Sequence, residues 1–130
     1  MRRPRRMFRA ALAACCVVAV ALSGVTAAAA QAPKKAPVKV TVNDFYFAPT
    51  AVTIKKGRAV KWVWSSYNTY PHDVHLKQGP KALKNKARFS TTTTAVTDAH
   101  FQRTFEVPGT YKFICTVHPS EMKMTVTVKK

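Results

Sequence analysis

The segment PGTYKFICTVHPSEMKMTVTV, residues 108–128, combines a β-strand pattern with a cluster of sulfur and imidazole side chains. It opens with a Pro-Gly turn signal. Every second residue after the turn is a large apolar residue or a thiol: Tyr111, Phe113 and Cys115. The closing part repeats the alternation with Met124, Val126 and Val128. A period of two is typical of strands with one buried face. The segment therefore predicts two strands, joined by a short loop that begins at Cys115.

The same period of two continues toward the N-terminus. The apolar faces of the other expected strands are Val38, Val40 and Val42; Val52 and Ile54; Val60, Trp62 and Trp64; Val74 and Leu76; and Phe101, Phe105 and Val107. Arg103 interrupts the last of these faces, and no segment has a sustained helical period. We therefore predict an all-β sandwich or barrel of seven to eight strands with antiparallel pairing. Residues 78–99 are the least regular, and we expect a long loop there with room for one short strand or helical turn.

The first 30 residues have the three-part composition of a secretory signal. Five arginines precede residue 10, residues 10–30 carry no charge, and four alanines end at Ala30. Cleavage after Ala30 would place the protein in the periplasm, the cell envelope or the extracellular space. A transmembrane anchor is the alternative, because about 20 apolar residues can cross a bilayer, but this stretch is alanine-rich and only mildly apolar. Residues 31–37 then form a flexible leader, and residues 38–130 form one domain.

Two further patterns in this segment concern the export route. Residues 5–9 are similar to a twin-arginine signal, and this alternative stays open. Residues 12–15 are similar to a lipoprotein cleavage box, which would attach a lipid to Cys15. We discount the box because only five apolar residues separate Arg9 from Cys15.

One cysteine remains after the signal, because Cys15 and Cys16 leave with it. Exported proteins normally pair their cysteines, so the single Cys115 is either an inert buried thiol, a reactive one or a metal ligand. The loop that follows favours a metal, because it also holds His118 and Met122. Thiolate and thioether ligands suit Cu(I), and imidazole suits both oxidation states of copper. Two His and one Cys with a long axial Met form a known copper arrangement, so a second histidine must come from elsewhere.

Strand phase selects the second histidine. His75 and His100 are out of phase with their apolar neighbours and should face solvent. His72 is in phase with Val74 and Leu76 and should face the interior at one end of the sandwich. An interior histidine is more often a hydrogen-bonded core residue than a ligand, but the Cys-His-Met loop favours ligation here. By the same argument Met124, in phase with the last strand, belongs to the core, and Met122 in the loop is the axial candidate.

These residues resemble the plastocyanin, amicyanin and pseudoazurin families of small cupredoxins over residues 38–128. The resemblance rests on FYFAP (45–49), VTIKKG (52–57), VKW (60–62), PHDV (71–74), PGTY followed by Phe113 (108–113), and CTVHPSEM (115–122). It implies a Greek-key, cupredoxin-like fold. It also places His72, Cys115, His118 and Met122 on the four copper ligands of the family.

The resemblance further implies that the chain is an exported one-electron carrier, with one type 1 (blue) copper that cycles between Cu(I) and Cu(II). Protein side chains would fill all four metal positions and leave none for a substrate, so we expect no enzymatic activity. Two alternatives remain. One is a copper carrier or buffer in the cell envelope without a redox partner. The other is a metal-free module that binds an anionic envelope polymer through the basic loop 81–88.

Two positions depart from the family pattern. The spacing from His118 to Met122 is four residues, between the three of amicyanin-like loops and the five of plastocyanin-like loops. Asp73 stands where plastocyanin has an asparagine that braces the ligand loops. The ligand surroundings therefore gain a negative charge here.

In this family, electrons are taken to leave through the exposed edge of the loop histidine, here His118, within an apolar patch to which Pro71 and Pro119 would belong. The formal net charge is +17, and loss of the five signal arginines would leave +12. We expect an acidic redox protein or an anionic envelope surface as partner, although the charge could serve solubility alone. We expect a monomer, with no nucleic acid and no small-molecule substrate.

Overall fold

The computed structural model describes residues 35–130, so the predicted signal and most of the predicted leader lie outside the described residues. Within this range the chain forms eight strands and one 3-10 helix, which agrees with the expected seven to eight strands. The elements are β1 (Val38–Asn43), β2 (Tyr46–Ala48), β3 (Ala51–Lys55), β4 (Ala59–Trp64), β5 (His75–Gln78), η1 (Lys86–Phe89), β6 (His100–Thr104), β7 (Gly109–Ile114) and β8 (Lys123–Lys129). Residues 35–130 contain no helix long and apolar enough to cross a membrane.

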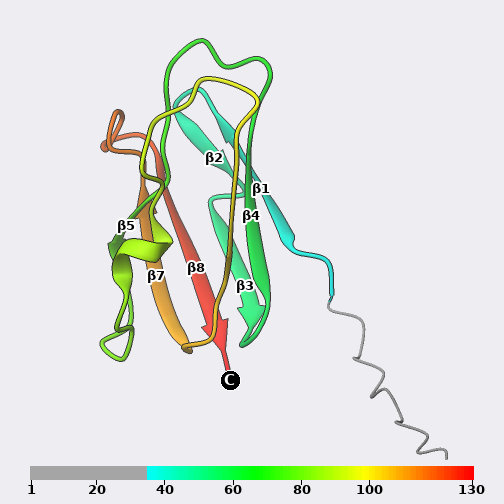
Figure 1. Ribbon diagram of the computed structural model, residues 1–130, viewed down its shortest axis with the longest axis vertical. Helices are drawn as coiled ribbons and strands as arrows, with labels where there is room; N and C mark the ends of the chain where they lie inside the picture. The colour runs from blue at the N-terminus through cyan, green and yellow to red at the C-terminus, as the bar shows by residue number, and fades with distance from the viewer. Residues whose placement is uncertain (1–34) are drawn as a thin grey trace, which may run out of the picture. The chain divides into compact units, whose positions relative to one another are not determined.

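The strands form two four-stranded sheets (Figure 1), with the orders β2-β1-β4-β6 and β3-β8-β7-β5. The all-β sandwich is therefore confirmed, but purely antiparallel pairing is wrong. β1 pairs with β4 in parallel, and β3 pairs with β8 in parallel. Parallel neighbours need a crossover connection, and here the chain leaves the first sheet after β2, adds β3 to the second sheet and returns as β4. Sequence alternation shows which face of a strand is buried, but it does not show the neighbouring strand or its direction.

Buried aromatic side chains from both sheets meet around Trp62 of β4, which is fully buried. Its ring centroid lies 5.0 Å from that of Phe113 in β7 and 5.5 Å from that of Phe101 in β6. Burial alternates strictly along β4 and β8, as the period of two predicts. Each large apolar side chain that is fully buried contributes roughly 1.5–3 kcal/mol. This core gives the loops at the ends of the sandwich a rigid base.

The irregular segment 78–99 contains the single helical turn η1 and is held to the body by two buried side chains, Leu83 and Phe89. The predicted long loop with a helical turn is therefore confirmed. Arg103, which interrupts the apolar pattern of β6, places its guanidinium 4.2 Å from the centroid of the Phe101 ring. This cation–π contact lets a charged residue occupy an otherwise apolar strand face.

Four loops meet at one end of the sandwich, at the top of Figure 1. β1 and β4 run in the same direction and both end there, and the loop between β7 and β8 turns there as well. The loops comprise residues 44–45, 65–74, 90–99 and 115–122. All the candidate ligand residues lie in these loops.

Candidate metal centre

His72 lies in the loop before β5, and its side chain is fully buried, as its phase predicted. Its backbone forms an isolated bridge with Ala95: His72 N–H donates to Ala95 O at 2.8 Å, and Ala95 N–H donates back to His72 O at 2.9 Å. The same His72 carbonyl accepts the indole N–H of Trp64 at 3.2 Å. Three hydrogen bonds therefore fix the backbone that carries this imidazole.

Cys115 directly follows β7, and its thiol is fully buried and forms no disulfide. Its backbone N–H donates to Met122 O at 3.1 Å, which closes the base of the loop. The backbone N–H of Asp73 donates to Cys115 Sγ at 3.5 Å. This contact links the thiol to the residue that follows His72.

His118 lies within the same loop, and its Nδ1 atom is buried without any hydrogen-bond partner among the described residues. A buried polar atom without a partner costs about 1–3 kcal/mol, so its presence in a well-packed loop needs an explanation. Its ring is also close to that of His72, with centroids 4.9 Å apart. The two imidazoles therefore approach one another beside the sulfur.

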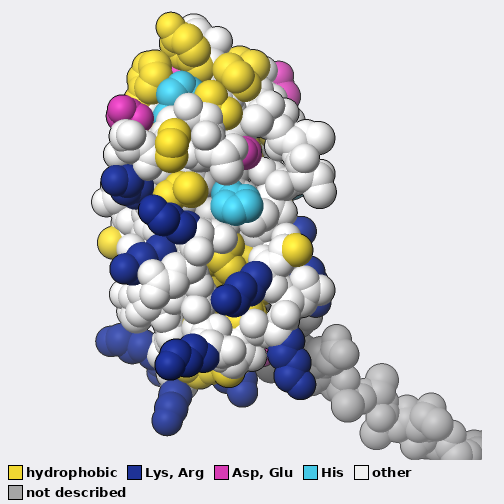
Figure 2. Space-filling model, turned by 90° about the vertical axis from the view of Figure 1, so that its left-hand side faces the viewer, with side chains coloured by type: hydrophobic (Ala, Val, Ile, Leu, Met, Phe, Trp, Pro, Cys, Tyr) yellow, Lys and Arg dark blue, Asp and Glu magenta, His cyan; other side chains and the backbone are white. Residues whose placement is uncertain are grey.

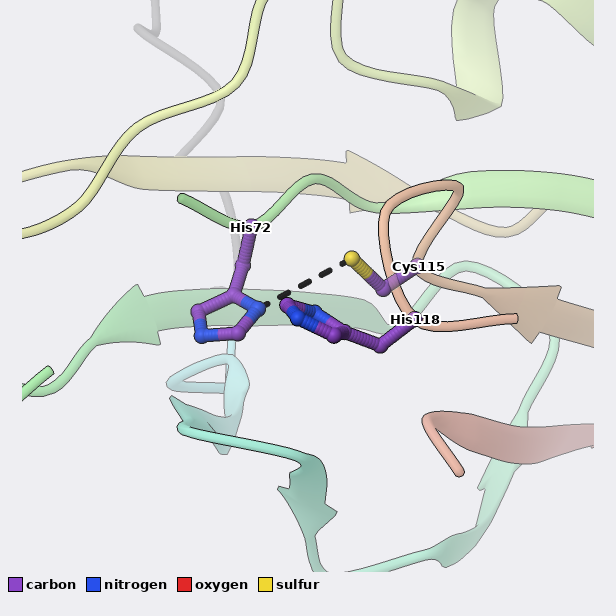
Figure 3. A group of neighbouring side chains, drawn as sticks. All are labelled: His72, Cys115 and His118. Atoms are coloured by element: carbon purple, nitrogen blue, oxygen red, sulfur yellow. Dashed lines mark hydrogen bonds between the residues drawn. The ribbon is translucent and has the colours of Figure 1, made fainter. Parts of the chain in front are cut away.

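Figure 3 shows how His72, Cys115 and His118 converge. One ring nitrogen of each histidine and Cys115 Sγ all lie within 4.8 Å of one another, and His72 Nδ1 is 3.8 Å from the sulfur. A buried thiol, an imidazole nitrogen directed at it and a second nitrogen with no partner are the features of a metal cage. Imidazole and thiolate together fit copper. The sequence predicted that these three residues meet, and the structure brings them together.

The two methionines have different surroundings. Met124 lies in the core, where the indole N–H of Trp62 donates to Met124 Sδ at 3.1 Å. Met122 lies in the loop, is fully buried, and donates its backbone N–H to His118 O at 2.9 Å. Met124 is thus already engaged on the core side, which supports the choice of Met122 as the axial candidate.

Asp44, in the turn between β1 and β2, contacts the far side of His72 and was missed by the sequence analysis. Its Oδ1 atom lies 2.8 Å from His72 Nε2. This hydrogen bond is the main cause that holds the pKa of the Asp44 carboxyl well below its ordinary value, and contacts with Thr69 and Tyr70 lower that pKa further. No local pattern identifies the residue, because an acid in a turn is common and the histidine it contacts lies 28 residues away.

Asp73 connects the two ligand loops, as expected for a residue at this position. The backbone N–H of Thr116 donates to Asp73 Oδ1 at 2.7 Å, and the Thr116 hydroxyl donates to Asp73 Oδ2. Because the Asp73 N–H also reaches the Cys115 sulfur, the residue directly after His72 holds both the thiol and Thr116, the residue that follows the thiol. The other histidines, His75 and His100, are exposed, as their phase predicted.

The fold and the cage define the class of protein: a β-sandwich with a buried histidine and cysteine metal site at one end, of the copper-binding type. Residues 34–129 match the family described as copper binding proteins, plastocyanin/azurin family. Over 125 residues the chain is 36% identical to amicyanin-alpha of Methylorubrum extorquens, a match that covers 94% of this chain and 96% of that protein. The chain therefore belongs to the plastocyanin/azurin family of copper-binding proteins.

Solved structures agree with this assignment. A mutant fern plastocyanin superposes with a TM-score of 0.57 at 28% identity, over 71% of this chain and 100% of that one. A copper-containing nitrite reductase from Thermus scotoductus superposes with a TM-score of 0.61 at 26% identity. The second match covers 80% of this chain and only 25% of the reductase, so it concerns one part of a much longer chain.

Proposed function

We propose that this chain is a one-electron carrier with His72, Cys115, His118 and Met122 as its copper ligands. Bound there, one copper would supply the redox couple, Cu(I) and Cu(II). The observation that carries the proposal is the convergence of two imidazole nitrogens on a buried cysteine sulfur, within 4.8 Å. The family membership of the chain supports copper as the metal.

The chain's own contribution is rigidity. His72 is fixed by its bridge to Ala95 and by Trp64, while Asp73 ties the thiol loop to the histidine loop. Ligands that cannot move far need little rearrangement when the charge of the site changes, and a small rearrangement makes electron exchange fast. With four protein ligands in place, no position remains for a substrate, unlike in catalytic metal sites. We therefore infer that the chain is not an enzyme.

In this proposal the electron leaves through the edge of His118. Of the two candidate ligand histidines, His72 is buried and His118 is half-exposed. The ring contacts two exposed aromatic residues, with centroid distances of 5.0 Å to Phe45 and 6.1 Å to Tyr70. Pro71 and Pro119 are also exposed, which supports the apolar patch expected around this residue. An apolar surface of this kind permits close approach of a partner without the cost of desolvating charges.

Charge is separated along the sandwich, and this changes where an anionic partner would bind. We call the end of the sandwich with the four loops 44–45, 65–74, 90–99 and 115–122 the copper end. These loops contain no Lys or Arg but hold four of the five acids: Asp44, Asp73, Asp98 and Glu121. In Figure 2 hydrophobic side chains gather at one end of the molecule, and Lys and Arg side chains are spread over the rest of that face among other residues. The basic body is therefore the surface that favours an acidic partner or an anionic envelope surface, and the end around His118 is not.

A basic region lies at the opposite end from the copper loops. A groove of about 590 Å³ there is lined by Lys35, Val38, Thr53, Ile54, Lys55, Lys56, Gly57, Arg58 and Lys129. It contains five cations and no acid. An exported protein that holds an anionic surface with this end would keep its copper end directed away from that surface. Export itself, with cleavage after Ala30, and a monomeric state remain part of this proposal.

Addition of Cu(II) to the reduced, folded protein tests the proposal. We expect an intense blue absorption from the bond between thiolate and copper, together with fast electron self-exchange. A folded sample that stays colourless would exclude both the electron carrier and the copper buffer. Colour with slow self-exchange, but with rapid transfer of copper to an acceptor, would favour the buffer.

A further inference from the structure

The Asp44 carboxylate has more hydrogen-bond partners than the other carboxylates at the copper end. Beside His72 Nε2, it accepts the backbone N–H of Thr69 at 2.9 Å, the Thr69 hydroxyl at 2.9 Å and the backbone N–H of Tyr70 at 3.3 Å. These contacts join the turn after β1 to the loop that carries His72. The carboxylate is therefore held in a fixed position behind the imidazole.

This contact determines which nitrogen of His72 carries the proton. An ionised carboxylate only accepts hydrogen bonds, so Nε2 must be the donor. In a neutral imidazole, Nδ1 then has a free lone pair. That atom lies on the other side of the ring, 3.8 Å from Cys115 Sγ. The ring is thus held in the one neutral form that can bind a metal next to the thiol.

No Lys or Arg of the loops at this end balances the charge of Asp44. Its close contact with a basic side chain among the described residues is the one with His72. A carboxylate behind a metal-bound histidine makes the imidazole a stronger electron donor. A stronger donor stabilises the more highly charged Cu(II) relative to Cu(I).

We propose that Asp44 is a positioning residue that holds His72 in its copper-binding tautomer and lowers the reduction potential of the site. The effect on the reduction potential rests on the proposed electron-carrier function. The effect on the tautomer does not, because the tautomer can be measured without copper. A purely structural role, in which Asp44 does no more than anchor the loop through Thr69 and Tyr70, predicts different results.

The first experiment measures the reduction potential of the copper-loaded full chain and of Asp44→Asn. The amide keeps the shape and the acceptor oxygen but removes the charge, so we expect a higher potential. A tenfold loss of preference for Cu(II) corresponds to about 59 mV for one electron, and we expect a rise of at least that order. Asp98→Asn is the matched control, because Asp98 is an exposed acid at the same end, bonded to Thr97, with a positive φ that Asn tolerates. Equal shifts in the two variants would overturn the charge effect.

The second experiment uses the copper-free protein and nitrogen NMR of the imidazole rings. We expect His72 to carry its proton on Nε2 in the natural chain and to populate both tautomers in Asp44→Ala. An unchanged Nε2 tautomer in Asp44→Ala, in a sample that remains folded, would contradict the proposal. If the natural chain failed to bind copper, the proposed electron-carrier function would be excluded. This measurement would still decide whether Asp44 sets the tautomer. Should Asp44→Ala not fold, the same spectrum of Asp44→Leu, which is close in size to Asp but also lacks an acceptor oxygen, decides the question: tautomer mixing supports the proposal and its absence contradicts it.

Discussion

The indole N–H of Trp62 donates to the sulfur of Met124 at 3.1 Å, across 62 residues of sequence. This contact distinguishes the two methionines near the copper end. It engages the sulfur of Met124 on β8, whereas Met122 lies in the loop that carries Cys115 and His118. Both are buried, so burial alone would not distinguish them. If Met124 is a core residue and Met122 a copper ligand, replacing each of them with alanine should have opposite effects on the spectrum and on the stability.

We expect Met122→Ala to keep the blue colour but to shift the spectrum and the reduction potential, because an axial thioether is a long, weak ligand. Met124→Ala should leave the spectrum nearly unchanged and lower the free energy of unfolding by about 2–5 kcal/mol, the usual cost of truncating a buried methionine. Visible spectra, voltammetry and chemical denaturation of both variants check this. The reverse outcome would show that the axial assignment is wrong.

Removing a cage residue should abolish the colour. Cys115→Ser removes the sulfur, and His72→Ala removes the nitrogen 3.8 Å from it, so neither variant should show the blue absorption after addition of Cu(II). His75→Ala is the matched control, since this histidine lies three residues away, is exposed and does not belong to the group formed by His72, Cys115 and His118. It should bind copper like the natural chain. Retained colour in Cys115→Ser, or lost colour in His75→Ala, would disprove the site.

Two glycines allow backbone strain and steric contact to be separated. Gly57 and Gly109 both have a positive φ, of 84° and 137°, a backbone conformation that residues other than glycine rarely adopt. A Cβ at position 109 would lie 2.6 Å from Pro80 Cγ, whereas one at position 57 meets nothing within 4 Å. Gly57→Ala should cost about 1–2 kcal/mol for the left-handed backbone. Gly109→Ala should cost more, by an additional 1–3 kcal/mol or so for overpacking, as measured by urea denaturation. Equal losses would show that Pro80 moves freely.

Local alternation was enough to predict seven of the eight strands, their buried faces and the inward direction of His72, but not the short strand β2, and β6 ends at Thr104, before Phe105 and Val107. It was sufficient because burial of an apolar face depends only on the residues of that strand. The parallel pairs β1–β4 and β3–β8 could not be predicted in this way, because each joins segments that are far apart in the sequence. Asp44 could not be predicted for the same reason, since its role depends on two loops meeting in space. The separation of charge, by contrast, is visible in the sequence once the four loops are known.

That separation of charge makes a last prediction about binding to an anionic surface. Lys55 ends β3 beside Lys129, the last residue of β8, whereas Met122 immediately precedes the start of β8. Lys55 and Lys56 therefore lie at the opposite end of the sandwich from His118. Each lysine near an anionic bilayer contributes about 1 kcal/mol. The double variant Lys55→Gln, Lys56→Gln should therefore bind vesicles of anionic phospholipid roughly 30-fold more weakly than the natural chain.

Cosedimentation with anionic and zwitterionic vesicles measures this effect. The natural chain should bind only the anionic vesicles and should dissociate as salt shortens the screening length from about 30 Å at 0.01 M to about 3 Å at 1 M. Asp98→Asn, at the copper end, should bind like the natural chain. Because the His118 edge would point away from the lipid, a small neutral oxidant should oxidise the reduced protein equally fast on and off the vesicles. A strong slowing on the vesicles would mean that the copper end, and not the basic end, faces the membrane.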